Sequence, residues 1–126
     1  MGKRVLVVDD NPAMVGLLSD ALTKAGFSVS SAEDGKTGLA LVKSAKPDVV
    51  VLDLMMPVMS GLQVLNALRR SPETKWLPVV ILTGRDGHED ALDGWMAGAD
   101  RYLTKPCRLE DVVAAVRQML APARRR

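Results

Sequence analysis

Three short runs of aliphatic residues, separated by longer amphipathic stretches, constrain the fold of this chain most strongly. The runs lie at residues 5–8, 49–52 and 79–82 and contain only Val, Ile and Leu. This pattern is typical of strands that are buried on both faces, as in a parallel sheet covered by helices. Residues 27–32 alternate between polar and apolar side chains, which indicates a strand nearer the edge of the sheet. A weaker apolar pair, Tyr102 and Leu103, predicts a fifth strand.

Amphipathic patterns between these strands predict the helices. Apolar residues recur with helical spacing along residues 14–25, 61–68 and 109–120, and less clearly along 35–45 and at Leu92, Trp95 and Ala99. Asn11 can cap the first helix, and Gly26 fits the left-handed position that ends it. Ser60 is the candidate N-cap of the helix that begins at residue 61. Strand and helix alternate five times, which predicts an α/β fold with one doubly wound parallel sheet and helices on both faces.

Length and composition limit the classes of protein that need to be considered. A chain of 126 residues, 48% hydrophobic and 25% charged, suits one globular domain and excludes a disordered or collagen-like chain. Subtracting the three arginines 124–126 from the formal net charge of +2 leaves −1, which makes no case for broad nucleic-acid binding. The single cysteine excludes an internal disulfide, and no apolar run is long enough to span a bilayer. We therefore expect a cytoplasmic protein with a domain at 3–121 and a basic tail or linker stub at 122–126.

Side chains suited to metal and phosphate chemistry follow the ends of the predicted strands. They are Asp9 and Asp10 after the first strand, Asp53 after the third, Thr83 after the fourth and Lys105 after the fifth. Ligands of doubly wound sheets bind outside the carboxyl ends of the strands, so these side chains should converge. Three carboxylates in close quarters repel one another, and Mg²⁺ would relieve that repulsion. A carboxylate can also attack a phosphoryl group, so we interpret the site as phosphate capture on Asp53, with Lys105 neutralising charge and the Thr83 hydroxyl donating a hydrogen bond.

These residues, in their order and spacing, resemble the receiver domain of response regulators in two-component signalling. The resemblance rests on Asp9-Asp10, Asp53 with Pro57 and Gly61, Thr83-Gly84, Gly98-Ala99-Asp100, Tyr102 and Lys105-Pro106. It covers the chain from about residue 3 to residue 120. The family match implies a flavodoxin-like (βα)5 fold whose five parallel strands have the order 2-1-3-4-5. It also implies a phosphorylation-dependent switch that turns over no external substrate.

The resemblance implies roles for the residues of the acidic pocket. Asp53 corresponds to the phosphoacceptor, which takes a phosphoryl group from a histidine kinase or a small acyl phosphate. Asp10 and Asp53 correspond to ligands of Mg²⁺, with Asp9 beside them and the main-chain carbonyl of Met55 as a further ligand. Lys105 corresponds to the lysine that contacts the phosphoryl group, and in the family its bond to the following proline is often cis.

The resemblance also implies how the signal leaves the domain. Thr83 and Tyr102 correspond to a switch pair, in which the hydroxyl moves toward the phosphoryl group and the ring turns inward. The expected partners are a sensor histidine kinase or histidine phosphotransfer protein, and a downstream protein target or effector domain; no membrane or direct nucleic-acid contact is expected. The output face would comprise the fourth helix, the fifth strand and the fifth helix, and homodimerisation through that face is left open. Met55 and Arg85 stand at positions that tune dephosphorylation in the family, and we expect them to hinder the attacking water.

Two other functions fit parts of the pattern. A magnesium-dependent phosphatase of the haloacid-dehalogenase type also forms an aspartyl phosphate, but needs a second acid two residues after the nucleophile. Met55 occupies that position and cannot donate a proton. A binding module that keeps the fold but ignores phosphate is the other alternative, and the complete set of acids, hydroxyl and lysine argues against it. Cys107 and Arg108 stand where the family most often has a bulky Phe and a better capping residue, so the packing of the last helix is less well determined.

Overall fold

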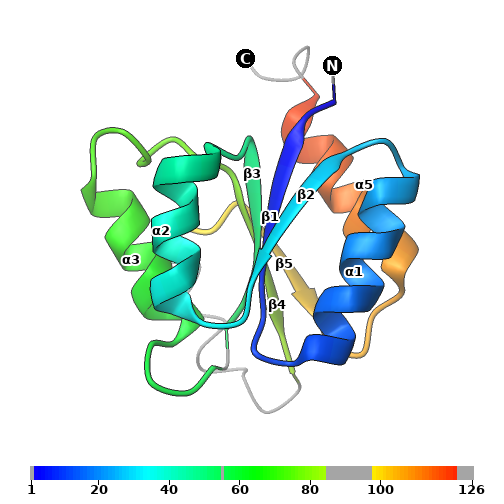
Figure 1. The fold of residues 1–126 in the computed structure, drawn as a ribbon, viewed down its shortest axis with the longest axis horizontal. Coiled ribbons are helices and arrows are strands. Elements are labelled where there is room, and N and C mark those ends of the chain that lie inside the picture. The colour runs from blue at the N-terminus through cyan, green and yellow to red at the C-terminus, as the bar shows by residue number, and fades with distance from the viewer. Residues whose placement is uncertain (1, 55, 85–97, 122–126) are drawn as a thin grey trace.

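A five-stranded parallel sheet lies between two layers of helices in the computed structural model (Figure 1). The structure describes residues 2–54, 56–84 and 98–121. Its strands are β1 (Arg4–Val8), β2 (Ser28–Ala32), β3 (Val49–Asp53), β4 (Val79–Thr83) and β5 (Arg101–Thr104), and the helices of the described residues are α1 (Pro12–Lys24), α2 (Gly35–Ala45), α3 (Gly61–Arg70) and α5 (Leu109–Leu120). The strand order β2-β1-β3-β4-β5 confirms the predicted flavodoxin-like fold.

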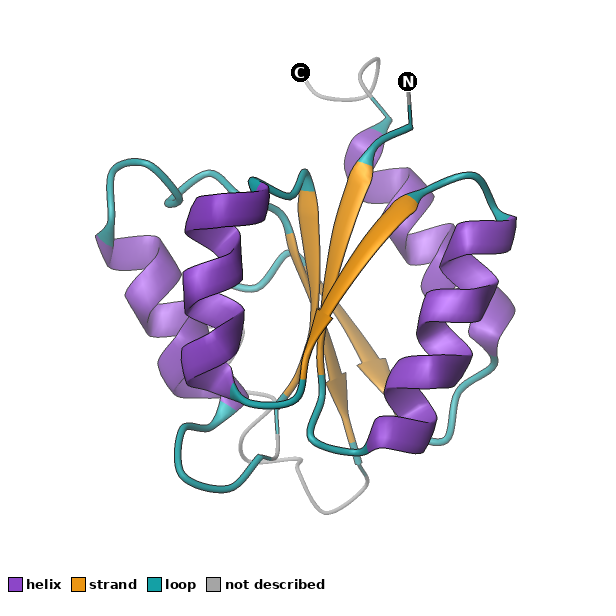
Figure 2. Cartoon of the chain, viewed as in Figure 1, coloured by secondary structure: helices purple, strands orange, loops and turns teal. Residues whose placement is uncertain are grey.

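The two faces of the sheet bury separate apolar clusters, because successive side chains of a strand point to opposite sides. Helices α2 and α3 cover one face and helices α1 and α5 the other (Figure 2). Leu6, Leu52 and Ile81 belong to the first cluster, while Val7 and Val51 belong to the second. Every residue of β3 and β4 is buried, whereas no residue of β5 is fully buried. The aliphatic runs of the sequence are therefore the central strands, as predicted.

The helix ends follow the predicted capping residues. The Asn11 side chain accepts hydrogen bonds from the main-chain N–H groups of Ala13 and Met14 at 3.0 and 3.3 Å. Gly26 has a φ of 100° and lies just after the end of α1. The Ser60 side chain accepts from Gln63 in a capping box at the start of α3. Because the cap fixes where α1 begins, it places the acid pair directly between β1 and this helix.

One helix prediction is wrong at its last residue, and the rest of that helix lies outside the described residues. Ala99 is buried but stands in the turn before β5 rather than in a helix. Gly98 precedes it with a φ of 103°, in the left-handed region, so a right-handed helix cannot continue through this residue. Leu92 and Trp95, which carried the rest of the pattern, are not among the described residues.

Gly61 allows α3 to begin directly against the end of β3. Its N–H donates to the carbonyl of Leu54 at 3.0 Å. A side-chain Cβ at this position would collide with the main-chain oxygen of Asp53 and lie 2.7 Å from the Cα of Leu54. Position 61 therefore requires a glycine if the strand end that carries Asp53 is to keep its place. Among the described residues, no helix is both long and apolar enough to cross a membrane.

Candidate functional site

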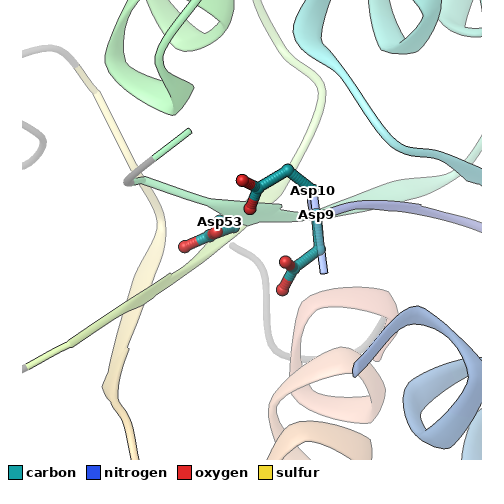
Figure 3. A group of neighbouring side chains, drawn as sticks. All are labelled: Asp9, Asp10 and Asp53. Atoms are coloured by element: carbon teal, nitrogen blue, oxygen red, sulfur yellow. The ribbon is translucent and has the colours of Figure 1, made fainter. Parts of the chain in front are cut away.

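Three carboxylates meet at the carboxyl ends of two adjacent strands (Figure 3). Asp9 and Asp10 follow β1, and Asp53 is the last residue of β3, which pairs with β1 in parallel. One carboxylate oxygen of each residue lies within 4.8 Å of those of the other two. Asp9 and Asp53 are only 1% and 5% exposed, whereas Asp10 is exposed. The structure thus brings together the three acids that the sequence places at the strand ends.

Lys105 supplies a positive charge to the two buried acids. Its Nζ lies 3.2 Å from Asp9 Oδ2 and 3.5 Å from Asp53 Oδ1. Partial burial lowers the pKa of the ammonium, but the attraction of Asp53 and Asp9 and their hydrogen bonds outweigh this effect, so the pKa of Lys105 is raised. Lys105 therefore stays protonated at neutral pH and offsets part of the negative charge. The main-chain N–H of Lys105 donates to the Thr83 carbonyl at 2.6 Å, and the Lys105–Pro106 peptide bond is cis.

Main-chain and side-chain contacts together hold Asp9 in place. Its Oδ1 accepts a hydrogen bond from the Asn11 N–H at 3.0 Å, while its Oδ2 faces Lys105. Its own N–H donates to the Ala32 carbonyl at 3.1 Å. The sequence pattern predicted Asn11 only as a helix cap, and this second contact was not predicted. The position of Asn11 in the sequence could have predicted this contact. A residue that caps a helix directly after two acids turns its main-chain N–H back toward those acids.

Thr83 and Tyr102 occupy neighbouring strands at different depths. Thr83 ends β4 and is 2% exposed, with its hydroxyl 3.5 Å from the Gly84 carbonyl oxygen. Tyr102 lies in β5 beside Ile81, two steps before the residue that pairs with Thr83. Its ring is half-buried against the apolar cluster under α2 and α3. Thr83 therefore lies at the edge of the acidic pocket, whereas Tyr102 lies farther back along the sheet.

The donor set of the pocket fits a hard divalent cation. Asp9, Asp10 and Asp53 offer carboxylate oxygens, which Mg²⁺ prefers, and one side of the cluster is open at the exposed Asp10. The Lys105 ammonium of the same pocket can contact the oxygens of a phosphoryl group. Met55 and Arg85, to which the sequence also assigned places at this pocket, lie outside the described residues.

A known protein family matches almost the whole chain. The family model described as "Response regulator receiver domain" matches residues 5–117. The chain belongs to the response-regulator receiver family. Receiver domains are signalling switches, so the family agrees with the fold and with the acidic pocket described above.

Individual relatives show how widely this receiver domain is shared. The chain is 47% identical over 116 residues to the probable transcriptional regulatory protein TcrX of Mycobacterium tuberculosis. The matched region covers 92% of this chain and 49% of that protein. It is 44% identical over 117 residues to the response regulator PleD of Caulobacter vibrioides, covering 93% of this chain and 25% of that protein. The crystal structure of the Vibrio cholerae chemotaxis protein CheY4 covers 95% of this chain and all of its own, at 32% identity and a TM-score of 0.88.

The shared region is the receiver domain alone. This chain spans about half the length of the first curated relatives that it matches, or 49%, 48% and 51% of them. In contrast, it covers 100% of the chemotaxis protein and 96% of the solved Francisella receiver domain, to which it is 32% identical with a TM-score of 0.85. The likeness therefore establishes the switch domain, and the outputs of the longer relatives belong to those proteins.

Proposed function

We propose that this receiver domain is switched by phosphorylation of Asp53. The observation that carries the proposal is the position of the Asp53 carboxylate, which is buried at a strand end, beside two other carboxylates, with the Lys105 ammonium 3.5 Å away. Such a carboxylate is held in place, and its surroundings are prepared to neutralise added negative charge. In-line phosphoryl transfer needs little else from a protein.

The chemistry uses one Asp53 carboxylate oxygen as the nucleophile. This oxygen attacks the phosphorus of the donor, and the bond from phosphorus to the imidazole nitrogen of a phosphohistidine breaks, or the bond to oxygen of an acyl phosphate. The departing group takes the electron pair, and the product is an acyl phosphate on Asp53. Lys105 stabilises the charge on the phosphoryl oxygens throughout, because its raised pKa keeps it protonated. Hydrolysis by water later restores the carboxylate and releases inorganic phosphate.

The proposed ligands of Mg²⁺ are the carboxylates of Asp9, Asp10 and Asp53 and the carbonyl of Met55. The bound ion would neutralise charge and orient the phosphoryl oxygens. Asp9 is already engaged by Asn11 and Lys105, so it would act beside the ion rather than as its main ligand. Asp10, exposed at the rim, is suited to bind the ion directly.

Transmission of the signal would use Thr83 and Tyr102. The Thr83 hydroxyl would turn toward the phosphoryl group, and the Tyr102 ring would move further into the space that this leaves. The output face would comprise β5 and α5 with the helix predicted from Leu92 and Trp95.

A histidine kinase or phosphotransfer protein would supply the phosphoryl group in the cytoplasm, and a protein target or effector domain would bind the output face. In this proposal the receiver domain spans residues 3–121, with a basic tail at 122–126.

Intact-mass analysis tests the proposal directly. Wild type, Asp53→Asn and Asp20→Asn would be incubated with acetyl phosphate or phosphoramidate, with Mg²⁺ or with a chelator. Asp20→Asn is the matched control, because Asp20 is an exposed aspartate on α1 whose ion-pair partner is the nearby Lys24. We expect one metal-dependent phosphoryl adduct in wild type and in the control, and none in Asp53→Asn. An adduct that persists in Asp53→Asn would disprove the role of Asp53. No adduct in any sample would leave either a strict requirement for the histidine kinase or a phosphate-independent binding module.

The same samples separate a switch from an enzyme. A haloacid-dehalogenase-like phosphatase would hydrolyse p-nitrophenyl phosphate over many turnovers, and Met55 in place of its general acid argues against this. We expect no sustained release of p-nitrophenol under conditions in which acetyl phosphate labels the protein. We also expect slow loss of the adduct, because Met55 and Arg85 would hinder the attacking water. A rate equal to that of fast-cycling receivers would refute that last expectation alone.

A further inference from the structure

A cluster of polar contacts joins α3 to the beginning of the last two strands, well away from the acidic pocket. Arg69 lies near the end of α3, and its side chain is only 18% exposed. Its Nε donates to the Gly98 carbonyl at 2.9 Å, its Nη1 to the Leu77 carbonyl at 2.8 Å, and its Nη2 to Asp100 Oδ2 at 3.0 Å. One guanidinium therefore binds the segments that lead into β4 and into β5.

Asp100 extends the pairing of these two strands by one step. The ladder between β4 and β5 begins with Val80 beside Arg101. One residue earlier, the Asp100 N–H donates to the Val79 carbonyl at 3.0 Å, and the Val79 N–H donates to Asp100 Oδ2 at 2.9 Å. The same carboxylate oxygen accepts from Arg69. We call these contacts of Arg69 and Asp100 the Arg69–Asp100 clasp.

The strand that the clasp holds has little other support. β5 has four residues and pairs only with β4 among the described strands, and none of its residues is fully buried. Register in a sheet is set mainly by which face of each strand is buried, so a short, half-exposed edge strand has weakly specified register. The central strands β3 and β4, whose residues are all buried, do not have this weakness.

The other end of β5 carries the lysine of the acidic pocket. Lys105 follows the last residue of the strand, and its N–H closes the ladder on the Thr83 carbonyl at 2.6 Å. From there its Nζ reaches Asp9 and Asp53. A slip of one residue would displace the chain by about 3.3 Å and turn each side chain to the opposite face. Lys105 would then lose both carboxylates.

We propose that the Arg69–Asp100 clasp is a positioning device for the phosphorylation site. It fixes the register of β5 on β4 and so holds the Lys105 ammonium beside Asp9 and Asp53. The importance of this for phosphoryl transfer rests on the proposed function, but the placement of Lys105 belongs to the unphosphorylated domain and can be measured there. Arg69 and Asp100 touch no group of the pocket and act only through β5.

The clasp can be tested by NMR on the full chain. Arg69→Met removes all the donors, and Asp100→Asn keeps an acceptor for Val79 but removes the charge. Arg70→Met is the matched control, because Arg70 is the next residue of the same helix and is exposed. The readouts are the scalar coupling across the hydrogen bond from Lys105 N–H to Thr83, and amide exchange in β5 compared with β3.

In Arg69→Met we expect the coupling to vanish and exchange in β5 to become at least about tenfold faster, while β3 keeps its protection. Asp100→Asn should show a smaller change in the same direction, and Arg70→Met none. Unchanged coupling and exchange in both clasp variants would overturn the proposal. Equal loss of protection in β3 and β5 would also overturn it, since that is the result of general destabilisation.

Phosphorylation provides the second readout. With acetyl phosphate and saturating Mg²⁺, Arg69→Met should form the Asp53 adduct several-fold more slowly than wild type, whereas Arg70→Met should match wild type. An unaltered rate, in a variant whose β5 has lost its protection, would overturn the link between the clasp and the site. If wild type forms no adduct with acetyl phosphate or with a phosphohistidine donor, the proposed function fails, and the NMR result still decides whether the clasp sets the register.

Discussion

Strands β3 and β5 both supply a residue to the same pocket, but they are held in place by different forces. β3 lies between β1 and β4, and all five of its residues are buried between two apolar clusters. β5 is a half-exposed edge strand with polar contacts at its two ends. The position of the Asp53 carboxylate therefore follows from apolar burial, whereas the position of Lys105 depends on a few directional hydrogen bonds.

This difference suits the roles proposed above for the two residues, with Asp53 as nucleophile and Lys105 as the phosphoryl-binding cation. A nucleophile needs a fixed position, and burial on both faces supplies it. The Lys105 ammonium has to contact phosphoryl oxygens that arrive and leave. A strand with few buried contacts suits this role, because such a strand can shift at a lower cost in free energy. The pocket thus combines an acidic nucleophile held by apolar burial with a basic group held by a few hydrogen bonds.

Matched truncations of two leucines should show the largest contrast. Leu52 of β3 is 0% exposed, and Leu103 of β5 is partly buried against the other apolar cluster. Leu52→Ala should lower the free energy of unfolding by about 2–5 kcal/mol, because it leaves a cavity in the core. Leu103→Ala should cost roughly half as much, since solvent already reaches part of that side chain. Urea denaturation measures both, and equal losses would break the comparison between the strands.

The central strands could be predicted from the sequence because their burial is visible in it. Uninterrupted Val, Ile and Leu at positions 49–52 and 79–82 are compatible with little except a strand covered on both faces. The edge strand showed only Tyr102 and Leu103, since a half-exposed strand needs few apolar residues. Its register was not predictable, because the clasp at its start binds mostly main-chain carbonyl groups, which every residue possesses.

The members of the acidic pocket were predictable for a similar reason. Parallel strands end at one edge, so the acids after β1 and β3 had to approach one another. The sequence did not distinguish the buried Asp9 from the exposed Asp10, because that depends on how the chain turns at Asn11. It also assigned no role to Arg69, whose hydrogen-bond partners lie 5 to 31 residues farther along the chain.

Two glycine substitutions sharpen the same comparison. An alanine at position 61 would place its Cβ against the main chain of Asp53 and Leu54, so Gly61→Ala should lower the free energy of unfolding by about 3 kcal/mol. Gly98→Ala would place a Cβ 3.1 Å from Arg69 Nε at a φ of 103°, and should cost about 1–2 kcal/mol. Gly16→Ala, at an open position of α1, is the control and should be neutral or stabilising. Thermal unfolding measures all three variants. A larger loss of stability in Gly98→Ala than in Gly61→Ala would contradict the expectation that the end of β3 tolerates change less than the start of β5.

Removing the charge of Lys105 should have a smaller effect that a metal ion reverses. Lys105→Met leaves Asp9 and Asp53 buried without their ammonium, and should lower the free energy of unfolding by about 1–3 kcal/mol in the presence of a chelator. Added Mg²⁺ should restore much of this, since it neutralises the same carboxylates. Lys24→Met is the control, because the Lys24–Asp20 pair is exposed and contributes at most about 0.5 kcal/mol. If Lys105→Met equals wild type without Mg²⁺, the lysine does not compensate the buried acids.

The smallest effect should come from Cys107, in the connection between β5 and α5. Burial, and then the negative charge of Asp111, raise the pKa of its thiol above the ordinary value of 9.0. The unfolded chain therefore loses this proton at lower pH than the folded domain does, so the thiol's contribution to stability is complete below pH 9.0 and declines as the pH rises through the raised pKa. The raised pKa of Lys105 adds to the same slope only as the pH approaches its ordinary value of 10.5, where the unfolded chain begins to lose that proton. Cys107→Ala should flatten the decline in urea midpoint that begins near pH 9.0. The wild-type thiol should also react with iodoacetamide more slowly than free cysteine at about pH 8. A thiol that reacts as fast as free cysteine would mean that the connection after β5 opens to solvent, and the weakly buried part of the fold would then extend from β5 into the start of α5.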